Sequence, residues 1–158
     1  MKTIAGIDPG LTGAVAFLCS DSYAEVYDAP VVNRDMNASG MTDLLDGQGI
    51  DLAIIERVGA MPKQGVASTF KFGFGCGVWR GVLAALEIPI VLVTPTTWKS
   101  EFHLCGKEKD ASREVALQLF PSLSSELARK KDHGRADALL LAEWGRRHDA
   151  GTLRSRAK

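Results

Sequence analysis

Three acidic residues occupy positions where an apolar segment ends or is interrupted. Asp8 ends the stretch KTIAGID just before a Pro-Gly turn, Glu56 ends the stretch DLAIIE, and Asp137 interrupts the stretch ADALLLA. Taken singly, each acid suits an ordinary turn, strand end or exposed helix position. Because two of them end apolar strands and the third interrupts an apolar helix face, together they predict one cluster of carboxylates.

A cluster of carboxylates favours a particular chemistry. Neighbouring negative charges repel one another unless a divalent cation neutralises them. Hard carboxylate oxygens suit Mg²⁺, with Mn²⁺ able to substitute. Two such ions activate a water and stabilise the leaving oxygen when a phosphodiester is hydrolysed. The acids therefore predict metal-dependent phosphodiester chemistry.

The elements that position these acids follow from hydrophobic patterning. Strands are predicted as an antiparallel meander followed by two buried segments of the parallel type, at residues 2–8, 13–20, 23–30, 51–56 and 88–95. Helices are predicted at residues 41–50, 68–87, 109–121 and 133–148, with a short helical turn at 96–102 and an irregular segment at 31–40. This order predicts an α/β fold with a mixed sheet. Adjacent strands would bring Asp8 and Glu56 to one sheet edge, and a helix packed across it would bring Asp137 to them.

Composition limits the classes of protein to consider. A chain of 158 residues with 46% hydrophobic residues suits one soluble domain. We expect no membrane span and no secretory signal, because no apolar run reaches about 18 residues and the N-terminus lacks a basic region. The three cysteines lack metal-ligand spacing and suit free thiols in a reducing cytosol. The formal net charge is zero, but residues 128–135 and the C-terminal tail are basic, which suits either a solubilising surface or a phosphate-binding face.

The chain resembles the RuvC family, the Holliday-junction resolvases of the ribonuclease H-like superfamily. The resemblance rests on GIDPGLTGAVAF, IIERV, MPKQGVASTFKFGFGCGVWRGVLAAL, VTPTTWKSEF and DHGRADALLLAEW, in this order. It implies a ribonuclease H-like mixed sheet with helices on both faces. It also implies a homodimer that makes paired, divalent-metal-dependent nicks in four-way DNA junctions. By motif position, Asp8, Glu56 and Asp137 match the catalytic acids of the family.

The fourth metal ligand of the family is where this sequence departs from the pattern. Many relatives have an acid or a histidine three residues before the last acid, and here that position is Gly134. His133 lies four residues before Asp137, on the same helix face, and is the first candidate for a replacement ligand. Asp132, at the predicted start of the helix, is the alternative.

The loop and helix after Glu56 suit contact with DNA. Polar side chains and aromatic rings are interleaved there, at Lys63, Gln64, Phe70, Lys71 and Phe72. Lysines bind phosphates and an aromatic ring stacks on an unpaired base, which contributes about 1–3 kcal/mol per base. Helical spacing cannot place all the phenylalanines on one face, so some are expected in the core or a dimer contact.

Two further segments supply candidate phosphate-binding lysines. Lys107 and Lys109 precede a predicted helix, where they suit either a phosphate contact or a solvated loop. Family members carry a functional lysine in this region. In TPTTWK, Trp98 suits packing and Lys99 is a second candidate for a DNA contact.

The glycine-bearing stretch FGFGCGVWRG predicts the homodimer contact. Glycine costs about 1 kcal/mol against alanine inside a helix, so the repeated glycines favour close approach of another backbone there. Phe74 and Trp79 are expected to add apolar area to the contact.

The sequence also leads to expectations for the domain organisation and leaves other functions open. We expect a nuclease domain over residues 1–150 and a basic tail over residues 151–158, in the cytoplasm of a bacterial or phage-infected cell. The opening glycine loop also resembles a phosphate loop of sugar kinases, but the chain is too short for their two domains, so no nucleotide cofactor is expected. A nuclease for other branched DNA or hybrids and a non-catalytic junction binder remain alternatives.

Overall fold

The two acid-bearing strands lie side by side in one sheet. The computed structural model describes residues 2–19, 23–57, 59 and 65–148. Five strands pair in the order β3-β2-β1-β6-β7, with bounds β1 Thr3–Asp8, β2 Ala14–Cys19, β3 Tyr23–Asp28, β6 Ile50–Glu56 and β7 Ile90–Val93. The first three strands are antiparallel, and β6 and β7 run parallel to β1. Ile7 pairs with Ile55, so β1 and β6 end at the same sheet edge.

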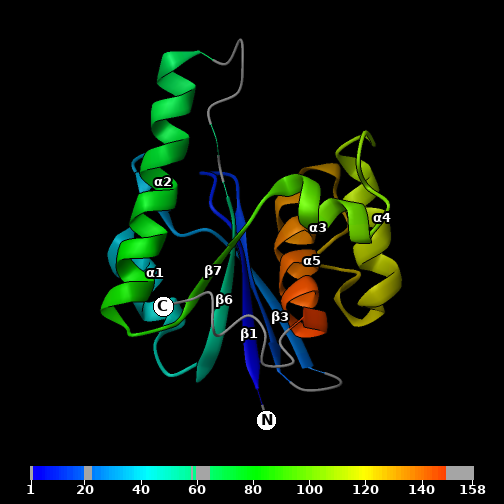
Figure 1. Ribbon diagram of the computed structural model, residues 1–158, viewed down its shortest axis with the longest axis horizontal. Helices are drawn as coiled ribbons and strands as arrows, with labels where there is room; N and C mark the ends of the chain where they lie inside the picture. The colour runs from blue at the N-terminus through cyan, green and yellow to red at the C-terminus, as the bar shows by residue number, and fades with distance from the viewer. Residues whose placement is uncertain (1, 20–22, 58, 60–64, 149–158) are drawn as a thin grey trace.

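Helices cover both faces of this sheet, as Figure 1 shows. On one face lie α1 and α2, and on the other lie α3, α4 and α5. Their bounds are α1 Ala38–Leu45, α2 Val66–Ala85, α3 Pro95–Glu101, α4 Asp110–Leu119 and α5 His133–His148, with short 3₁₀ turns at Pro121–Leu123 and Lys130–Asp132. The predicted mixed sheet with helices on both faces is therefore confirmed. Within the described ranges, no helix combines the length and apolar character that crossing a membrane requires.

Alternating side chains of the central strands supply the two cores. Ile4 and Ile54 face α5, whereas Ala5, Ile7 and Ile55 face α1 and α2. This alternation follows from the two-residue period of a strand buried on both faces.

Gly6 explains how α5 comes close enough to β1 to carry an acid to its end. A Cβ added at Gly6 would lie 2.1 Å from the carbonyl oxygen of Ala138 and 2.3 Å from the amide nitrogen of Ala142. The backbones of α5 and β1 are therefore in near contact at this point. Any larger residue would push the helix, and with it Asp137, away from the strand.

The segment predicted as irregular contains more structure than expected. β4 Val31–Val32 and β5 Asp35–Met36 form a short hairpin, and α1 begins at Ala38, where the side chain of Asn37 accepts a hydrogen bond of 3.0 Å from the amide of Gly40. The irregular prediction was wrong because the turn between β4 and β5 lacks the glycine that usually follows asparagine in such a hairpin, and has Arg34 after Asn33 instead.

The glycines of α2 have different surroundings. Gly75 packs closely, since an added Cβ would lie 2.8 Å from the carbonyl oxygen of Pro9. Added Cβ atoms at Gly73, Gly77 and Gly81 would meet nothing within 4 Å among the described residues. Close approach of another backbone within the chain therefore explains only Gly75.

Candidate active site

The ends of β1 and β6 border a pocket that encloses about 320 Å³. Strand ends, α2, α3, α4 and the start of α5 contribute its lining, which consists of Asp8, Gly10, Thr12, Glu56, Phe72, Lys99, Leu104, Lys107, Glu108, Lys109, Ser112, His133 and Asp137. We call this the acid pocket. The three acids that the sequence singled out thus meet at one pocket, although 129 positions separate the first from the last.

Asp8 is held at the end of β1 by the turn that follows it. The amide of Gly10 donates a hydrogen bond of 3.3 Å to Asp8 Oδ1. Burial, and then the negative charge of Asp137, raise the pKa of Asp8 to about 6. The Gly10 amide, His133 and Lys99 act in the opposite direction.

Glu56 is fixed from the neighbouring helix. The indole nitrogen of Trp98, a fully buried residue of α3, donates a hydrogen bond of 2.7 Å to Glu56 Oε2. Burial raises the pKa of Glu56, and the Asp8 charge adds to this effect. The Trp98 hydrogen bond and Lys99 lower it in part.

Asp137 carries an unsatisfied oxygen. Its Oδ1 atom is buried and has no hydrogen-bond partner among the described residues. Burial raises the pKa of Asp137 to about 6, and the Glu56 charge adds to this, while a hydrogen bond from Ser112 and the charge of Lys99 oppose it. A buried carboxylate oxygen without a donor is costly, so this atom calls for a cation or a proton.

The glycine at the fourth-ligand position makes room for the backbone. A Cβ added at Gly134 would lie 2.6 Å from the carbonyl oxygen of Thr12 and 3.3 Å from Asp8 Oδ2. The start of α5 therefore rests directly on the turn between β1 and β2. A side chain at this position has no room in the present arrangement.

The two alternative fourth ligands have different surroundings. His133 lines the acid pocket, and its Nδ1 lies 3.4 Å from the carbonyl oxygen of Lys130. Asp132 is only 4% exposed and forms a salt bridge of 2.8 Å with Arg129, whose side chain and amide both donate to it. It is not among the residues that line the pocket. The structure thus brings His133, and not Asp132, to the three acids.

Lysines provide positive charge around the acids. Lys99, Lys107 and Lys109 all line the pocket. Lys99 lowers the pKa of each of the three acids, and its Nζ lies 5.2 Å from the Trp98 ring centroid. Lys99 follows directly after Trp98, the tryptophan that donates a hydrogen bond to Glu56, and this position places it beside the acids.

Four residues of the pocket lining were not singled out in the sequence, namely Thr12, Leu104, Glu108 and Ser112. The turn after Asp8 was a usable signal for Thr12, because Thr12 follows that acid by four residues in the same turn. No pattern in the sequence distinguishes Ser112 from other helical serines.

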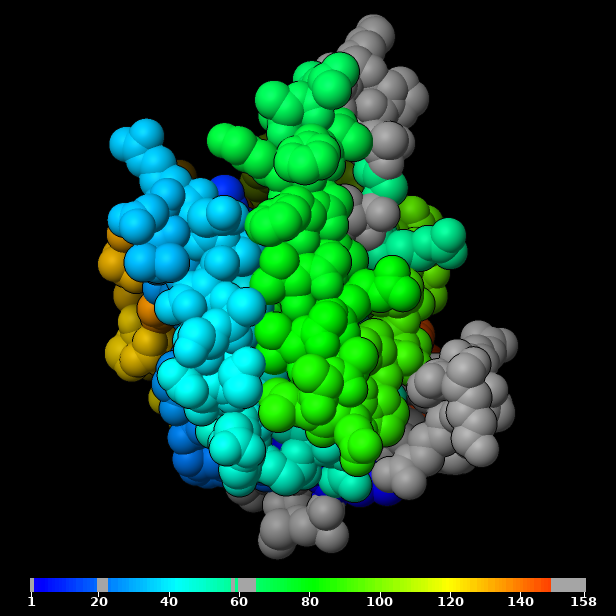
Figure 2. All heavy atoms as spheres, turned by 90° about the vertical axis from the view of Figure 1, so that its left-hand side faces the viewer, coloured from blue at the N-terminus to red at the C-terminus, as the bar shows by residue number. Residues whose placement is uncertain are grey.

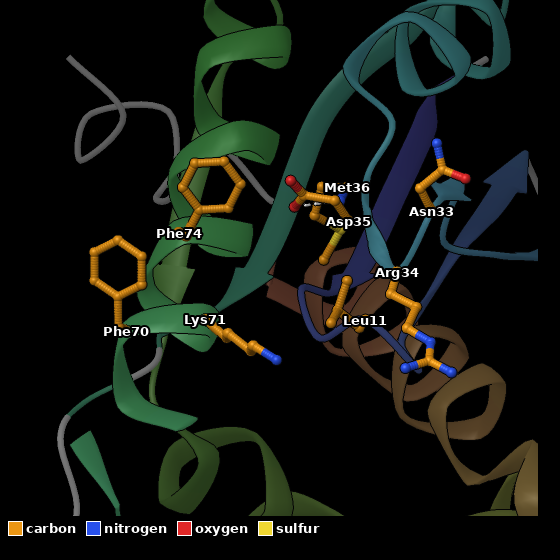
Figure 3. A pocket seen from close by; sticks show the side chains of 8 residues that line it. All are labelled: Leu11, Asn33, Arg34, Asp35, Met36, Phe70, Lys71 and Phe74. Atoms are coloured by element: carbon orange, nitrogen blue, oxygen red, sulfur yellow. Dashed lines mark hydrogen bonds between the residues drawn. The ribbon is translucent and has the colours of Figure 1, made fainter. Parts of the chain in front are cut away.

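The DNA-binding candidates of α2 separate onto different faces. Phe72 lines the acid pocket, whereas Phe70 and Lys71 border a second hollow, shown in Figure 3. The phenylalanines of α2 therefore separate onto different faces, as expected, but none of the three is buried in the core. Lys63 and Gln64 lie outside the described residues.

The donor set suits Mg²⁺ in its chemistry but not as a preformed cage. Among the described residues, no three His, Cys, Asp or Glu side chains are placed to hold one metal ion together. Mg²⁺ usually keeps several waters and binds through one or two carboxylates, so it does not require such a cage. The unsatisfied Oδ1 of Asp137 and the raised pKa values of Asp8 and Asp137 fit a site whose charge a cation balances.

Comparisons with known proteins identify similar chains. No family model matches the chain. The Holliday junction resolvase MOC1, chloroplastic, of Chlamydomonas reinhardtii is 38% identical over 85 residues, which are 53% of this chain and 10% of that protein. The chain therefore spans about a tenth of this curated relative.

Solved structures of RuvC share the fold over nearly the whole chain. T. thermophilus RuvC in complex with Holliday junction substrate has a TM-score of 0.59 at 18% identity and covers 94% of this chain and 97% of that chain. A second Thermus thermophilus RuvC structure has a TM-score of 0.58 at 17% identity and covers 92% of this chain and 95% of that chain. The chain thus has a RuvC-like fold, as the resemblance of its sequence implies.

Proposed function

We propose that the protein is a metal-dependent endonuclease that resolves four-way DNA junctions by paired phosphodiester nicks. The observation that carries the proposal is the meeting of Asp8, Glu56 and Asp137 at one pocket that three lysines also line. Carboxylates bind the metal and lysines bind the phosphate, which is the combination that phosphodiester hydrolysis requires. The RuvC-like fold and the similarity to the MOC1 resolvase support the choice of substrate.

Four side chains of the acid pocket are the proposed metal ligands. Asp8, Glu56, Asp137 and His133 would hold Mg²⁺, which supplies an activated water and stabilises the leaving oxygen. Asp132 is left out of this set because Arg129 already occupies its carboxylate.

The cations and aromatic rings would bind the DNA itself. Lys99, Lys107 and Lys109 would hold the phosphates on either side of the cut, because they line the same pocket as the acids. The wider DNA surface would include Lys63, Gln64, Phe70, Lys71 and Phe72, with an aromatic ring stacked on an unpaired base.

Paired nicks on a two-fold symmetric junction suit a homodimer. We propose that α2 supplies the dimer contact, through the glycine-bearing stretch that the sequence singles out. Phe74, which borders the second hollow together with Phe70, is left out of this contact. The contribution expected from Trp79 is withdrawn, because its side chain is 0% exposed and packs in the core beneath α2.

We also propose residues 1–150 as the nuclease domain.

Cleavage of a synthetic four-way junction tests the proposed function. Wild-type protein with Mg²⁺ is compared on a junction, a duplex, a fork and an RNA–DNA hybrid. The expected result is paired nicking of the junction, abolished in Asp8→Asn while junction binding persists. Asp43→Asn, which removes an exposed acid of α1 that is not part of the pocket lining, is the matched control and should cleave normally.

Other outcomes would change the proposal in defined ways. Equal cleavage of forks or hybrids would redirect it to another branched or hybrid substrate. Junction binding without cleavage under any divalent metal would favour a non-catalytic junction binder. Cleavage by Asp8→Asn near the wild-type rate would reject the assignment of the active site.

A further inference from the structure

A second cleft adjoins the acid pocket across the turn between β1 and β2. It encloses about 400 Å³ and is lined by Leu11, Asn33, Arg34, Asp35, Met36, Phe70, Lys71 and Phe74 (Figure 3). Gly10 and Thr12 line the acid pocket, whereas Leu11 between them lines the second cleft. In the same way, Phe72 of α2 lines the acid pocket and Lys71 lines the second cleft. One turn and one helix therefore separate two adjoining clefts.

The β4–β5 turn forms one wall of the second cleft with an arginine in an unfavourable conformation. Asn33 and Arg34 have φ angles of 49° and 63°, both in the left-handed region. Asn-Gly is the usual pair for such a turn, and a residue with a Cβ costs roughly 1–2 kcal/mol there. Arg34 is exposed, and its guanidinium makes no hydrogen bond or ion pair with any described residue. Among the described residues, the Arg34 side chain therefore makes no hydrogen bond or ion pair that would offset the free-energy cost of its left-handed backbone conformation.

Aromatic rings on α2 form the opposite wall. The Phe70 and Phe74 rings are stacked at 6.4 Å between centroids, with 19° between their planes. Both rings are exposed, although Leu11 and Met36 beside them are largely covered. Figure 2 shows the light-blue segment that contains β4 and β5 beside green α2, with a hollow between their upper ends.

The charges around the second cleft favour a polyanion. Arg34 lies on the β4–β5 side, and Lys71 extends from α2 toward it in Figure 3. Asp35 is the one acid of the lining, and its Oδ1 accepts a hydrogen bond of 2.8 Å from the amide of Met36. Two cations beside exposed aromatic rings match a nucleotide better than they match an apolar peptide, because a nucleotide offers both a phosphate and a base.

We propose that the second cleft binds one unpaired nucleotide of a DNA strand that continues from the acid pocket. Arg34 binds its phosphate, and the Phe70–Phe74 wall stacks on its base. The proposal rests on the proposed function, since it takes DNA as the partner, and adds the β4–β5 turn to the DNA surface. Because the two clefts adjoin, one strand reaches both without crossing the body of the protein.

Fluorescence anisotropy with labelled oligothymidylate, in the absence of divalent metal, tests the proposal. Arg34→Gly removes the guanidinium and also relieves the left-handed turn, so the melting temperature should stay unchanged or rise while affinity falls about tenfold. Arg34→Lys should retain most of the affinity. Glu87→Gly relieves a similar strain at φ 57° outside both clefts, and Arg80→Ala removes an exposed charge outside both; neither should weaken binding.

An abasic oligonucleotide separates the base contact from the phosphate contact. Phe70→Ala should weaken oligothymidylate binding about fivefold or more and leave the abasic affinity unchanged, whereas Arg34→Gly should weaken both. Equal oligothymidylate affinity for Arg34→Gly and Arg80→Ala would overturn the proposal. So would a change of oligomeric state in Phe70→Ala and Arg34→Gly without any change in affinity, because the cleft would then be a contact between copies.

Junction cleavage distinguishes failure of this proposal from failure of the proposed function. If the wild-type protein cleaves four-way junctions and Arg34→Gly binds and cleaves as well as wild type, only the second cleft is rejected. If no variant cleaves a junction but binding of oligothymidylate depends on Arg34 and Phe70, the cleft is supported and the resolvase assignment fails.

Discussion

The Trp98 indole nitrogen donates a hydrogen bond of 2.7 Å to Oε2 of Glu56, and so couples a residue of α3 to the end of β6. This contact lowers the pKa of Glu56 against the effect of burial. Trp98→Phe keeps an aromatic ring but removes the donor, so the pKa of Glu56 should rise further. We expect cleavage near neutral pH to fall about tenfold, and to recover in part as pH is raised, because a hydrogen bond to a charged group contributes about 1.5–3 kcal/mol.

Trp79→Phe is the matched control for the loss of an indole from the core. Trp79 is also fully buried, but its Nε1 has no hydrogen-bond partner among the described residues. Both variants should lose stability through the smaller ring. Only Trp98→Phe should shift the pH–rate profile upward, and an equal shift in both would show that packing, not the hydrogen bond, positions Glu56.

Asp8→Asn should stabilise the metal-free protein near neutral pH. The pKa of Asp8 is raised to about 6 in the folded state, above its unfolded value of 3.8. The stability contributed by protonated Asp8 is therefore complete below about pH 4 and is lost as pH rises through about 6. Asparagine keeps the acceptor for the Gly10 amide without the charge, and should raise the free energy of unfolding by about 1–3 kcal/mol.

Chemical denaturation across pH measures this effect. The difference between Asp8→Asn and wild type should be largest near neutral pH and should vanish toward pH 4. Added Mg²⁺ should stabilise wild type more than the variant, because it balances the same charge. A variant that is less stable than wild type at neutral pH without metal would contradict the assigned electrostatics.

Much of the fold was predictable because its strands are buried on both faces. Continuous apolar runs such as the one that ends at Glu56 leave little choice but a central strand, and the acids after such runs must meet at one edge. The β4–β5 hairpin was not predictable, because Asn33 and Arg34 adopt left-handed angles without the glycine that normally announces them.

The site was predictable in its acids and less so in what surrounds them. Acids that interrupt apolar patterns stand out, but the hydrogen bond from Trp98 to Glu56 depends on how α3 docks against β6. That docking is a tertiary property with no local signal. The difference between His133 and Asp132 likewise depends on Arg129, whose side chain and amide both bind the Asp132 carboxylate, which is not part of the pocket lining.

Lys99→Met should reduce both cleavage and junction affinity. Methionine keeps most of the apolar stem, so packing against Trp98 is largely retained. Loss of the charge should raise the pKa of all three acids of the pocket, since Lys99 lowers each of them. The slope of log affinity against log salt should fall by about one if Lys99 contacts a phosphate. An unchanged slope with reduced cleavage would restrict Lys99 to an effect on the acids.

Gly134→Ala should damage the site through the backbone. The added Cβ would lie 2.6 Å from the carbonyl oxygen of Thr12, which belongs to the turn that holds Asp8, and neither backbone can yield without moving α5 or that turn. We expect a loss of about 1–3 kcal/mol in unfolding free energy and reduced Mg²⁺-dependent cleavage, because Asp137 lies one helical turn further along α5. Gly81→Ala, also helical but facing open space, should instead stabilise by up to about 1 kcal/mol.

Thermal denaturation and the Mg²⁺ dependence of cleavage, measured together, check the prediction for Gly134→Ala. If α5 shifts relative to β1, the concentration of Mg²⁺ needed for half-maximal cleavage should rise, because Asp8 and Asp137 come from the two elements that move apart. A loss of stability alone, with unchanged Mg²⁺ dependence, would mean that the turn yields and the acids keep their places. Full stability and activity in Gly134→Ala would show that the close approach of Gly134 to Thr12 is not required to assemble the site.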